Sequence, residues 1–303
     1  MKIGLIDVDG HNFPNLPLMK LSAYHKRQGH DVDWFMPLYE YDKVYASKVF
    51  TFTPDYNTAI RADEVVWGGT GYSYMPELGL SDFKNDKLPP EVESICPDYS
   101  LYPQYNEAYG FLTRGCPRNC AFCIVTQKEG CKSKRVADLG EFWTGQKTIK
   151  LLDPNLLACN DRERVLQELA ASGVWVDFTQ GLDIRFIDKG IIELLNKIKI
   201  KIIHFAWDNP KEDLTPHFEI FAKFSDVKDR RRRSVYVLTN FNTTHEDDLM
   251  RIYALRKLQF DPYVMIYDKQ NAPRQTRLLQ RWVNNKRIFM TCDTFEEYDS
   301  KRG

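Results

Sequence analysis

The feature that most constrains the fold of this chain is a regular alternation of two sequence patterns between residues 109 and 283. Short runs rich in β-branched and aromatic residues predict strands, and stretches with apolar residues at helical spacing predict helices. Strands that alternate with helices form a parallel sheet, because each parallel crossover needs a dozen or more residues. The predicted strands are Tyr109–Thr113, Thr148–Leu152, Val174–Phe178 with an extension over Gly181–Phe186, Lys201–Trp207, Ser234–Leu238 and Pro262–Tyr267.

A helix is predicted after each of these strands. Six β/α units are too few to close a barrel of about eight strands. We therefore expect an α/β fold in which an open, partial (β/α)6 barrel covers residues 106–285 and the strand ends converge on one site. The predicted helices lie near Val136–Trp143, over Asp161–Ala171, over Lys189–Ile198, near Pro216–Phe224, over Glu246–Leu258 and over Pro273–Val283.

Residues 1–75 show the same alternation in a shorter form and predict a small Rossmann-like α/β domain in front of the barrel. Residues 76–105 read as a Pro- and Tyr-rich linker, which we expect to pack because its tyrosines are costly to leave in water. Residues 286–303 form a C-terminal tail. The predicted strands of the first domain are Ile3–Val8, Val32–Phe35, Val44–Phe50 and Glu64–Trp67, its helix is Leu16–Gln28, and the linker prolines are Pro76, Pro89, Pro90, Pro97 and Pro103.

Composition limits the surroundings in which the chain can work. It has 42 Lys and Arg against 42 Asp and Glu, so its bulk charge points to neither a nucleic acid nor a membrane. No run approaches the ~18 apolar residues of a membrane span, and the N-terminus lacks the apolar core of a signal peptide. We expect a cytoplasmic protein without a membrane partner. Its seven cysteines should then be reduced thiols, metal ligands or redox groups.

Three cysteines lie within eight residues, directly after the first predicted barrel strand. Cys116, Cys120 and Cys123 have the spacing Cys-x3-Cys-x2-Cys. A four-iron cluster takes one thiolate per iron, so a short loop can hold three irons and leave the fourth open. An open position on a metal distinguishes a catalytic site from a closed structural one. Arg114 and Arg118 in the same loop would offset the negative charge of such a cluster.

Two alternatives remain for these cysteines. A structural zinc site would need a fourth ligand, such as Cys131 or Cys96, but zinc sites usually combine two Cys-x2-Cys pairs and this chain has one. Reduced cysteines that bind no metal are the other alternative. The remaining thiols, Cys159 and Cys292, are isolated like Cys96 and Cys131, and an isolated thiol is expected to fill a core or to be a bystander.

The cysteine loop, with Phe122 before its last cysteine and five β/α units behind it, resembles the radical S-adenosylmethionine (SAM) superfamily. The resemblance implies a [4Fe-4S] cluster on Cys116, Cys120 and Cys123, with Phe122 as a cofactor contact. The open iron would chelate the methionine part of SAM. Reduction of the cluster, by a partner such as a flavodoxin or a ferredoxin, would cleave SAM to methionine and a 5′-deoxyadenosyl radical. That radical would take a hydrogen atom from the substrate.

The resemblance also implies SAM contacts at the ends of the later strands. Asp153 follows the second strand, where the family has a Gly-Gly-Glu turn, and would accept from the SAM ammonium group. Arg185 follows the third strand and would bind the SAM carboxylate. Asp208 follows the fourth strand and would bind the ribose. The alternatives are a turn-forming Asp153, a surface ion pair of Arg185 and a helix cap at Asp208.

The N-terminal domain resembles a shortened form of the cobalamin-binding domain that some radical SAM enzymes carry. The cobalt-binding motif of that family is Asp-x-His-x-x-Gly, and this chain has Asp9, His11 and, in place of glycine, Pro14. Ser47–Val49 and Gly68-Gly69 stand where the family has Ser-x-Leu and Gly-Gly. The domain is several tens of residues short, so we expect a domain that shapes the substrate pocket, with His11 an ordinary loop residue, in preference to one that binds cobalamin.

The leading interpretation is a radical SAM enzyme with an unidentified substrate. Two alternatives stay open: a non-catalytic iron–sulfur or zinc scaffold with a decayed SAM site, and a cobalamin-dependent radical methyltransferase. The basic run Lys228–Arg233 is read as a solvated loop or as a patch that faces phosphates, and it leaves RNA open as a partner.

Overall fold

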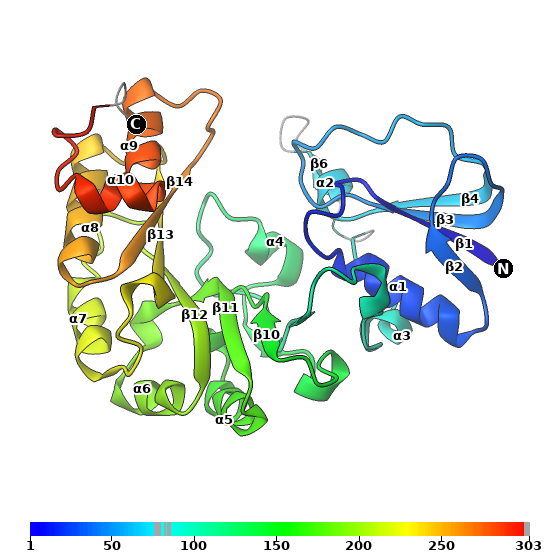
Figure 1. Cartoon of the computed structure of the whole chain (residues 1–303), viewed down its shortest axis with the longest axis horizontal. Helices are drawn as coiled ribbons and strands as arrows, with labels where there is room; N and C mark the ends of the chain where they lie inside the picture. Colours follow the sequence, from blue (N-terminus) through cyan, green and yellow to red (C-terminus); the bar gives the residue numbers. More distant parts are fainter. Residues whose placement is uncertain (76–79, 82, 84–85, 300–303) are drawn as a thin grey trace. The chain divides into compact units, whose positions relative to one another are not determined.

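The computed structural model describes residues 1–75, 80–81, 83 and 86–299, and the chain divides into two compact units (Figure 1). Unit 1 comprises residues 1–110 and 137–146, and unit 2 comprises residues 111–136 and 147–303. Pro76 of the predicted linker and the last four residues of the predicted tail lie outside the described residues. The domain boundaries expected from the sequence stay predictions.

Unit 1 contains a four-stranded sheet of order β2-β1-β3-β4, in which each neighbouring pair is parallel. The predicted small α/β domain is thereby confirmed. Helix α1 begins where Asn15 accepts a hydrogen bond from the Leu18 amide, with a proline in its first turn. The elements are β1 Lys2–Asp7, α1 Leu16–Arg27, β2 Asp31–Trp34, β3 Tyr41–Ser47, β4 Ala62–Gly68, α2 Thr70–Ser73, β5 Tyr74–Met75, β6 Leu80–Ser81, α3 Pro90–Glu93 and β7 Glu107–Gly110.

The described part of the Pro- and Tyr-rich segment belongs to the core of unit 1. Val92, Leu101 and Tyr102 are buried together with Leu18 of α1 in one hydrophobic cluster. The Tyr102 hydroxyl donates a 2.8 Å hydrogen bond to Asp7 at the end of β1. Because a buried tyrosine needs a partner for its hydroxyl, this bond fixes the segment to the carboxyl end of the sheet.

Buried His25, which contacts the partly buried His30, is expected to make the stability of unit 1 depend on pH. His25 is 5% exposed, and its ring nitrogens lie 2.9 Å from Nδ1 of His30 and 3.0 Å from the Tyr45 hydroxyl. Burial, and then the charges of His30 and Lys43, lower the pKa of His25 to about 4. The ordinary pKa of a histidine in the unfolded chain is about 6.5. The folded state therefore binds fewer protons than the unfolded state between these two values.

We expect unit 1 to lose about 3 kcal/mol of stability as the pH falls from 6.5 through 4, because protonation then favours the unfolded chain. Above pH 6.5 the contribution is fully present. Urea unfolding at pH 7 and pH 4.5 measures the difference, which His25→Asn should largely remove. His217→Asn in unit 2 is the matched control and should leave the difference intact. A wild-type chain equally stable at both pH values would contradict this expectation.

The larger sheet has the order β14-β13-β12-β11-β10-β7, and its neighbours from β10 to β14 pair in parallel. This arrangement confirms the predicted partial barrel. Helices α5 to α8 lie along one face of these strands (Figure 1). The elements of unit 2 are β8 Thr113–Arg114, α4 Val125–Glu129, β9 Lys134–Arg135, β10 Thr148–Leu151, α5 Arg162–Ser172, β11 Trp175–Leu182, α6 Lys189–Asn196, β12 Lys199–Ala206, α7 Thr215–Phe224, β13 Arg233–Thr239, α8 His245–Lys257, β14 Asp261–Ile266, α9 Arg274–Asn284 and α10 Lys286–Thr291.

The helix predicted near Val136–Trp143 is wrong. The structure has only a 3₁₀ turn at Leu139–Glu141, capped by Asp138. Gly140 lies inside the turn, and Gly145 has φ +108°. A glycine in a helix interior costs about 1 kcal/mol relative to alanine, and helices of fewer than ~12 residues gain little stability of their own. A glycine inside the segment and another just beyond it therefore leave too short a stretch for a helix.

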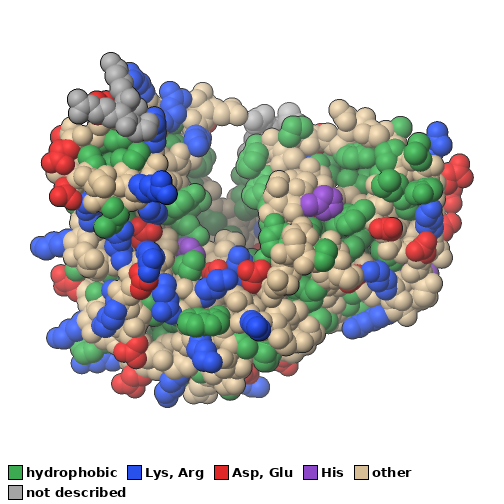
Figure 2. Space-filling model, in the orientation of Figure 1, with side chains coloured by type: hydrophobic (Ala, Val, Ile, Leu, Met, Phe, Trp, Pro, Cys, Tyr) green, Lys and Arg blue, Asp and Glu red, His purple; other side chains and the backbone are tan. Residues whose placement is uncertain are grey.

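The basic run and the C-terminal segment both pack against unit 2. The guanidinium groups of Arg232 and Arg233 donate to the backbone carbonyls of Ile200 and Val227, so two of the basic side chains are used inside the fold. Over the face seen in Figure 2, basic and acidic side chains are interspersed. Phe289 of α10 is buried against Trp282. Within the described ranges, no helix is both long enough and apolar enough to cross a bilayer.

Candidate functional site

The cysteine loop is an excursion closed at its base by a short antiparallel pair. Strand β8 pairs with β9, and the residues between them include all three cysteines and α4. Gly115 has φ +92°, and a Cβ atom there would collide with the carbonyl of Lys132. Only glycine fits this position, because it lacks the side chain that would clash and tolerates positive φ. The chain can thus turn sharply just before Cys116.

Glu129 at the end of α4 holds the start of the loop in place. Its carboxylate accepts from the Gly115 amide at 3.2 Å and pairs with Arg114 at 3.3 Å. The Cys116 amide donates to the Gly130 carbonyl at 3.1 Å. Arg114 was predicted to offset the charge of a cluster, whereas the structure shows its guanidinium paired with Glu129. The backbone on both sides of Cys116 is therefore fixed before any cofactor binds.

The three thiols lie close to one another and are partly buried. Burial raises the pKa of Cys120 and Cys123, and the neighbouring thiols raise it further. Asn155 donates from Nδ2 to the Cys116 sulfur at 3.5 Å, while its buried Oδ1 has no partner among the residues that the structure describes. Thiols that resist ionisation together are stable as thiolates only with positive charge among them. This donor set therefore fits an iron–sulfur cluster, and its binding would release protons.

The arrangement of the thiols also indicates whether they could bind a single metal ion such as zinc. Among the described residues, no three His, Cys, Asp or Glu side chains are grouped as the ligands of one ion. A zinc site needs its donors about 2.0–2.3 Å from a single point. A cubane cluster spreads its thiolates over separate irons and has no such requirement. Cys131 is exposed and Cys159 is buried, and Cys96 and Cys292 are partly buried.

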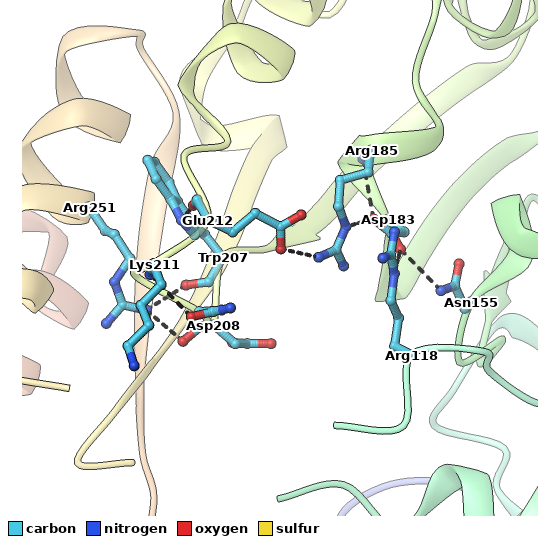
Figure 3. A network of polar contacts seen from close by, with 10 residues as sticks. Arg118, Asn155, Asp183, Arg185, Trp207, Asp208, Lys211, Glu212 and Arg251 are labelled. Carbon is cyan, nitrogen blue, oxygen red and sulfur yellow. Dashed lines mark hydrogen bonds and ion pairs between the residues drawn. The ribbon is translucent and has the colours of Figure 1, made fainter. Parts of the chain in front are cut away.

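Asp183 connects the cysteine loop to the end of β11, and the sequence analysis missed this role. Its carboxylate accepts from Arg118 at 2.7 Å, from Arg185 at 2.6 Å and from Asn155 at 3.4 Å (Figure 3). These donors hold the pKa of Asp183 below its usual range despite burial. The only signal in the sequence was an acidic residue two positions before Arg185. Arg118 and Arg185 are thus positioned by one carboxylate.

Arg185 lies at the strand ends, as predicted, with its guanidinium already in contact with two acids. Its Nε donates to Asp183, and its Nη1 donates to Glu212 at 2.7 Å (Figure 3). The side chains of Arg185 and Glu212 are 26% and 39% exposed, so this pair is open to solvent. The guanidinium has five N–H donors, which leaves further donors for an anionic ligand. Its predicted contact with SAM stays a prediction.

Asp153 has a structural role that the sequence did not reveal. It is 4% exposed, and its carboxylate accepts from the amides of Leu112 and Thr113 and from the Thr113 hydroxyl. Burial raises the pKa of Asp153 to about 6, although these hydrogen bonds oppose the rise. The bonds fix the chain just before the cysteine loop to the end of β10. The Asp153 carboxylate already accepts hydrogen bonds from the backbone. Its role as acceptor for the SAM ammonium group stays a prediction.

Asp208 lies beside the cysteines at the end of β12. Its Oδ1 accepts from the Leu238 amide at 3.2 Å, and burial raises its pKa. The Asp208 carboxylate is close enough to Cys120 and Cys123 to contribute to their raised pKa, after burial and the other thiols. Helix α7 begins only at Thr215 with Leu214 as its N-cap, so Asp208 does not cap it.

Arg251 of α8 fixes the position of Asp208, and the sequence analysis missed it. Its side chain is fully buried and donates to the carbonyl of Trp207 at 2.6 Å (Figure 3). It donates to the carbonyl of Leu238 at 3.0 Å as well. It also pairs with Asp248 at 2.5 Å. The available signal was an arginine on the apolar face of a predicted helix, one turn from Leu255. Through these bonds Arg251 connects the ends of β12 and β13.

Phe122 contacts an aromatic group at the last two strand ends. Its ring lies 5.4 Å from Phe241, edge to face, and Phe241 lies 4.8 Å from Tyr267. Asn240 and Asn242 adopt φ +63° and +52°. Asparagine tolerates left-handed backbone better than most residues, so these two accommodate the turns that follow β13. Phe122 thus lies next to the segment that follows β13.

The residues that resemble cobalamin ligands lie at the carboxyl ends of β1, β3 and β4 in unit 1. The His11 side chain is exposed, and its ring stands edge-on to Trp34 at 4.2 Å. Asp9 is occupied by the Val49 amide at 2.5 Å and the Thr53 hydroxyl at 2.6 Å. A Cβ atom at Gly69 would collide with the Lys48 carbonyl. The backbone of Lys48 thus occupies the space beside Gly69, whereas the His11 imidazole is accessible.

The comparisons with known proteins concern the fold. No protein-family model and no curated protein matches the sequence. Two solved structures of TsrM from Kitasatospora setae, a radical S-adenosylmethionine methyltransferase, do match. The structure with cobalamin and a [4Fe-4S] cluster bound has a TM-score of 0.62 at 11% identity. The structure with tryptophan substrate and the SAM analogue aza-SAM has a TM-score of 0.64 at 12% identity.

Each match covers 88% of this chain and 72% of TsrM. The uncovered part of this chain is smaller than unit 1, so each match extends into both units. This chain therefore has the fold of a radical SAM enzyme with an additional N-terminal α/β domain, as the sequence predicted. At 11–12% identity the similarity shows the fold alone. The chemistry has to be argued from the site residues of this chain.

Proposed function

We propose that this chain is a radical SAM enzyme that holds a [4Fe-4S] cluster on Cys116, Cys120 and Cys123. The observation that carries the proposal is the convergence of this loop with Asp208 and Arg185 at one edge of the sheet. In a parallel α/β sheet, ligands bind at the carboxyl ends of the strands. When bound, the cluster supplies the electron that cleaves SAM reductively to a 5′-deoxyadenosyl radical.

The chain's own residues position the reactants for this chemistry. Arg185 binds the SAM carboxylate with the donors that Asp183 and Glu212 leave unused. Asp208, held by Leu238 and Arg251, accepts from the ribose hydroxyls. The ring of Phe122, packed on Phe241, contacts the nucleoside. A flavodoxin or a ferredoxin is the proposed electron donor.

The direct test is a SAM-cleavage assay on the anaerobically reconstituted chain with dithionite as reductant. We expect 5′-deoxyadenosine and methionine to form in equal amounts, and neither to form without dithionite. A chain that carries a cluster yet yields no 5′-deoxyadenosine would contradict the proposal. That result would favour the non-catalytic scaffold.

Glu212 should weaken the binding of the SAM carboxylate at Arg185, because it places a like charge beside that carboxylate. We expect Glu212→Gln to tighten SAM binding about threefold, because an exposed ion pair contributes only about 0.2–1 kcal/mol. Arg185→Met should weaken it about tenfold or more, because a hydrogen bond between charged groups contributes about 1.5–3 kcal/mol. Calorimetric titration of the reconstituted chain with SAM measures both changes. Unchanged affinity in Arg185→Met would remove Arg185 from the SAM site.

Cobalamin-dependent methyl transfer is a second candidate, favoured by the structural match that extends into unit 1. Cobalamin, when bound, carries a methyl group between SAM and a substrate. The accessible His11 could ligate its cobalt, whereas the filled turn at Gly69 offers little room for the nucleotide tail. Cobalt content after incubation with hydroxocobalamin and gel filtration decides between the candidates. Stoichiometric cobalt that is lost in His11→Ala would favour methyl transfer, and its absence would favour hydrogen abstraction alone.

A further inference from the structure

The sheet of unit 2 has one face against its helices and an opposite face with different chemistry. Phe205 of β12 packs on Phe218 and Phe221 of α7, which identifies the helix-covered face. Side chains alternate along a strand, so His204 points to the opposite face. Phe205 is paired with Val235, and Tyr236 therefore shares the face of His204. We call the surface formed by Asp177, His204, Tyr236, Tyr263 and Met265 the open face.

His204 is held in a defined tautomer on the open face. Its Nδ1 lies 3.1 Å from the carbonyl of Phe178. A carbonyl can only accept, so Nδ1 carries the proton and Nε2 presents a lone pair. Within the described ranges, no residue hydrogen-bonds to Nε2. The side chain is 15% exposed, which leaves this acceptor within reach of a ligand.

Tyr236 provides a fixed aromatic support beside this acceptor. Its ring is stacked on the His204 ring, with centroids 5.0 Å apart and 11° between the planes. Its hydroxyl donates to the Thr179 carbonyl of β11 at 2.9 Å, so the side chain reaches across β12 and cannot swing away. Tyr263 meets Tyr236 edge to face at 6.0 Å. Tyr263 and Met265 are 43% and 47% exposed and extend the apolar surface along β14.

Burial favours the neutral imidazole of His204. Burial lowers the pKa of His204, and the carboxylate of Asp177, 4.0 Å from Nδ1, opposes this shift. Lys150 of β10 lies 3.9 Å from Asp177 and adds a repelling charge. The other titratable groups on the neighbouring strands are Tyr236 on β13 and Tyr263 and Asp261 on β14, and Asp261 is paired with Lys286 at 3.1 Å. Arg233 of β13 lies on the helix-covered face by the same alternation. A neutral imidazole accepts a hydrogen bond and carries no charge to repel a cationic ligand.

We propose that the open face at His204 and Tyr236 binds the substrate through a planar aromatic or heteroaromatic ring. An N–H or O–H group of that ring donates to Nε2 of His204, while Tyr263 and Met265 contact its faces and edge. His204 precedes Asp208 by four residues, about 13 Å of extended chain, so a substrate of moderate size spans from here to the strand ends. The identification of this ligand as the substrate rests on the proposed function. Its chemical class follows from the geometry of the open face.

Two matched probes, indole and 1-methylindole, test the proposal on the full chain. They share one ring system, but only indole has the N–H donor. We expect wild type to bind indole about threefold to tenfold more tightly than 1-methylindole, the factor that one neutral hydrogen bond provides. His204→Phe, which keeps a stacked ring but removes the acceptor, should bind both equally. A wild-type chain without the preference, or a His204→Phe chain that retains it, would overturn the proposal.

A second measurement needs no altered chain to remain folded. The ¹⁵N signal of His204 Nε2 in wild type should move when indole is added and stay unchanged with 1-methylindole, and His204→Gln serves only to assign the signal. A movement with both probes or with neither would overturn the assignment of Nε2 as acceptor. Both titrations require neither cluster nor reductant. A chain that fails to cleave SAM would therefore overturn the proposed function while these results still decide the binding site.

Discussion

Replacing Cys120 by alanine is expected to abolish the broad absorption of the reconstituted protein near ~400 nm and all reductive cleavage of SAM. Three of the four irons each take one thiolate, so the loss of one of the three ligands leaves a second iron open and the cluster labile. Iron content, the absorption spectrum and 5′-deoxyadenosine formation measure the effect under anaerobic conditions. A reduction of SAM cleavage by several orders of magnitude is expected.

Cys131→Ala is the matched control for this experiment. Cys131 lies in the same unit, beyond α4, and its side chain is exposed. We expect this variant to retain the iron, the absorption and the cleavage of wild type. If Cys131→Ala lost the chromophore as completely as Cys120→Ala, a closed site with four cysteine ligands would replace the open cluster. The pair of variants thus separates a cluster with an open iron from one that a fourth cysteine closes.

The second large effect is expected on stability. Arg251→Met should lower the free energy of unfolding of unit 2 by about 3–5 kcal/mol, because it leaves the buried Asp248 carboxylate without its partner. The side chains of Arg251 and Asp248 are 0% and 4% exposed, so solvent cannot replace the lost bonds. The carbonyls of Trp207 and Leu238 would lose their donors as well. Native-state hydrogen exchange at the amides of β12 and β13 measures the change.

Arg164→Met is the control, since it removes an arginine from another helix of the same unit. Arg164 is 74% exposed and pairs with Glu168, which keeps a second partner in Arg135. An exposed pair of this kind contributes at most about 1 kcal/mol. An equal decrease in the free energy of unfolding in the two variants would contradict the expectation that buried Arg251 stabilises unit 2 more than exposed Arg164 does. Weaker SAM binding in Arg251→Met alone would add that its bonds position Asp208.

The order of strands and helices was predictable because it depends on local patterns. The strands of the partial barrel bury long apolar side chains at every second position, and these alternations are visible in the sequence. The helix expected near Val136–Trp143 failed because Gly140 and Gly145 outweigh the apolar residues around them. Helix α10 was missed for the opposite reason, since its six residues form a helix only through the contact of Phe289 with Trp282.

The candidate site was predictable only in part. The three cysteines could be identified because their ligand spacing is contained in one short segment. Asp183 and Arg251 could not, because their roles come from partners far away in the sequence: Arg118 for the first, Trp207 and Leu238 for the second. Asp153 was recognised as important for a different purpose, since nothing in a local pattern shows that its carboxylate is occupied by the backbone of Leu112 and Thr113.

We propose that the cysteine loop holds a cluster with one iron open to SAM. The most direct measurement is the iron and sulfide content of the reconstituted chain, combined with its electron paramagnetic resonance spectrum after reduction, recorded with and without SAM. We predict about four iron and four sulfide per chain and a reduced-cluster signal that changes when SAM is added. One zinc and no iron per chain, or a cluster signal that SAM leaves unchanged, would contradict the account.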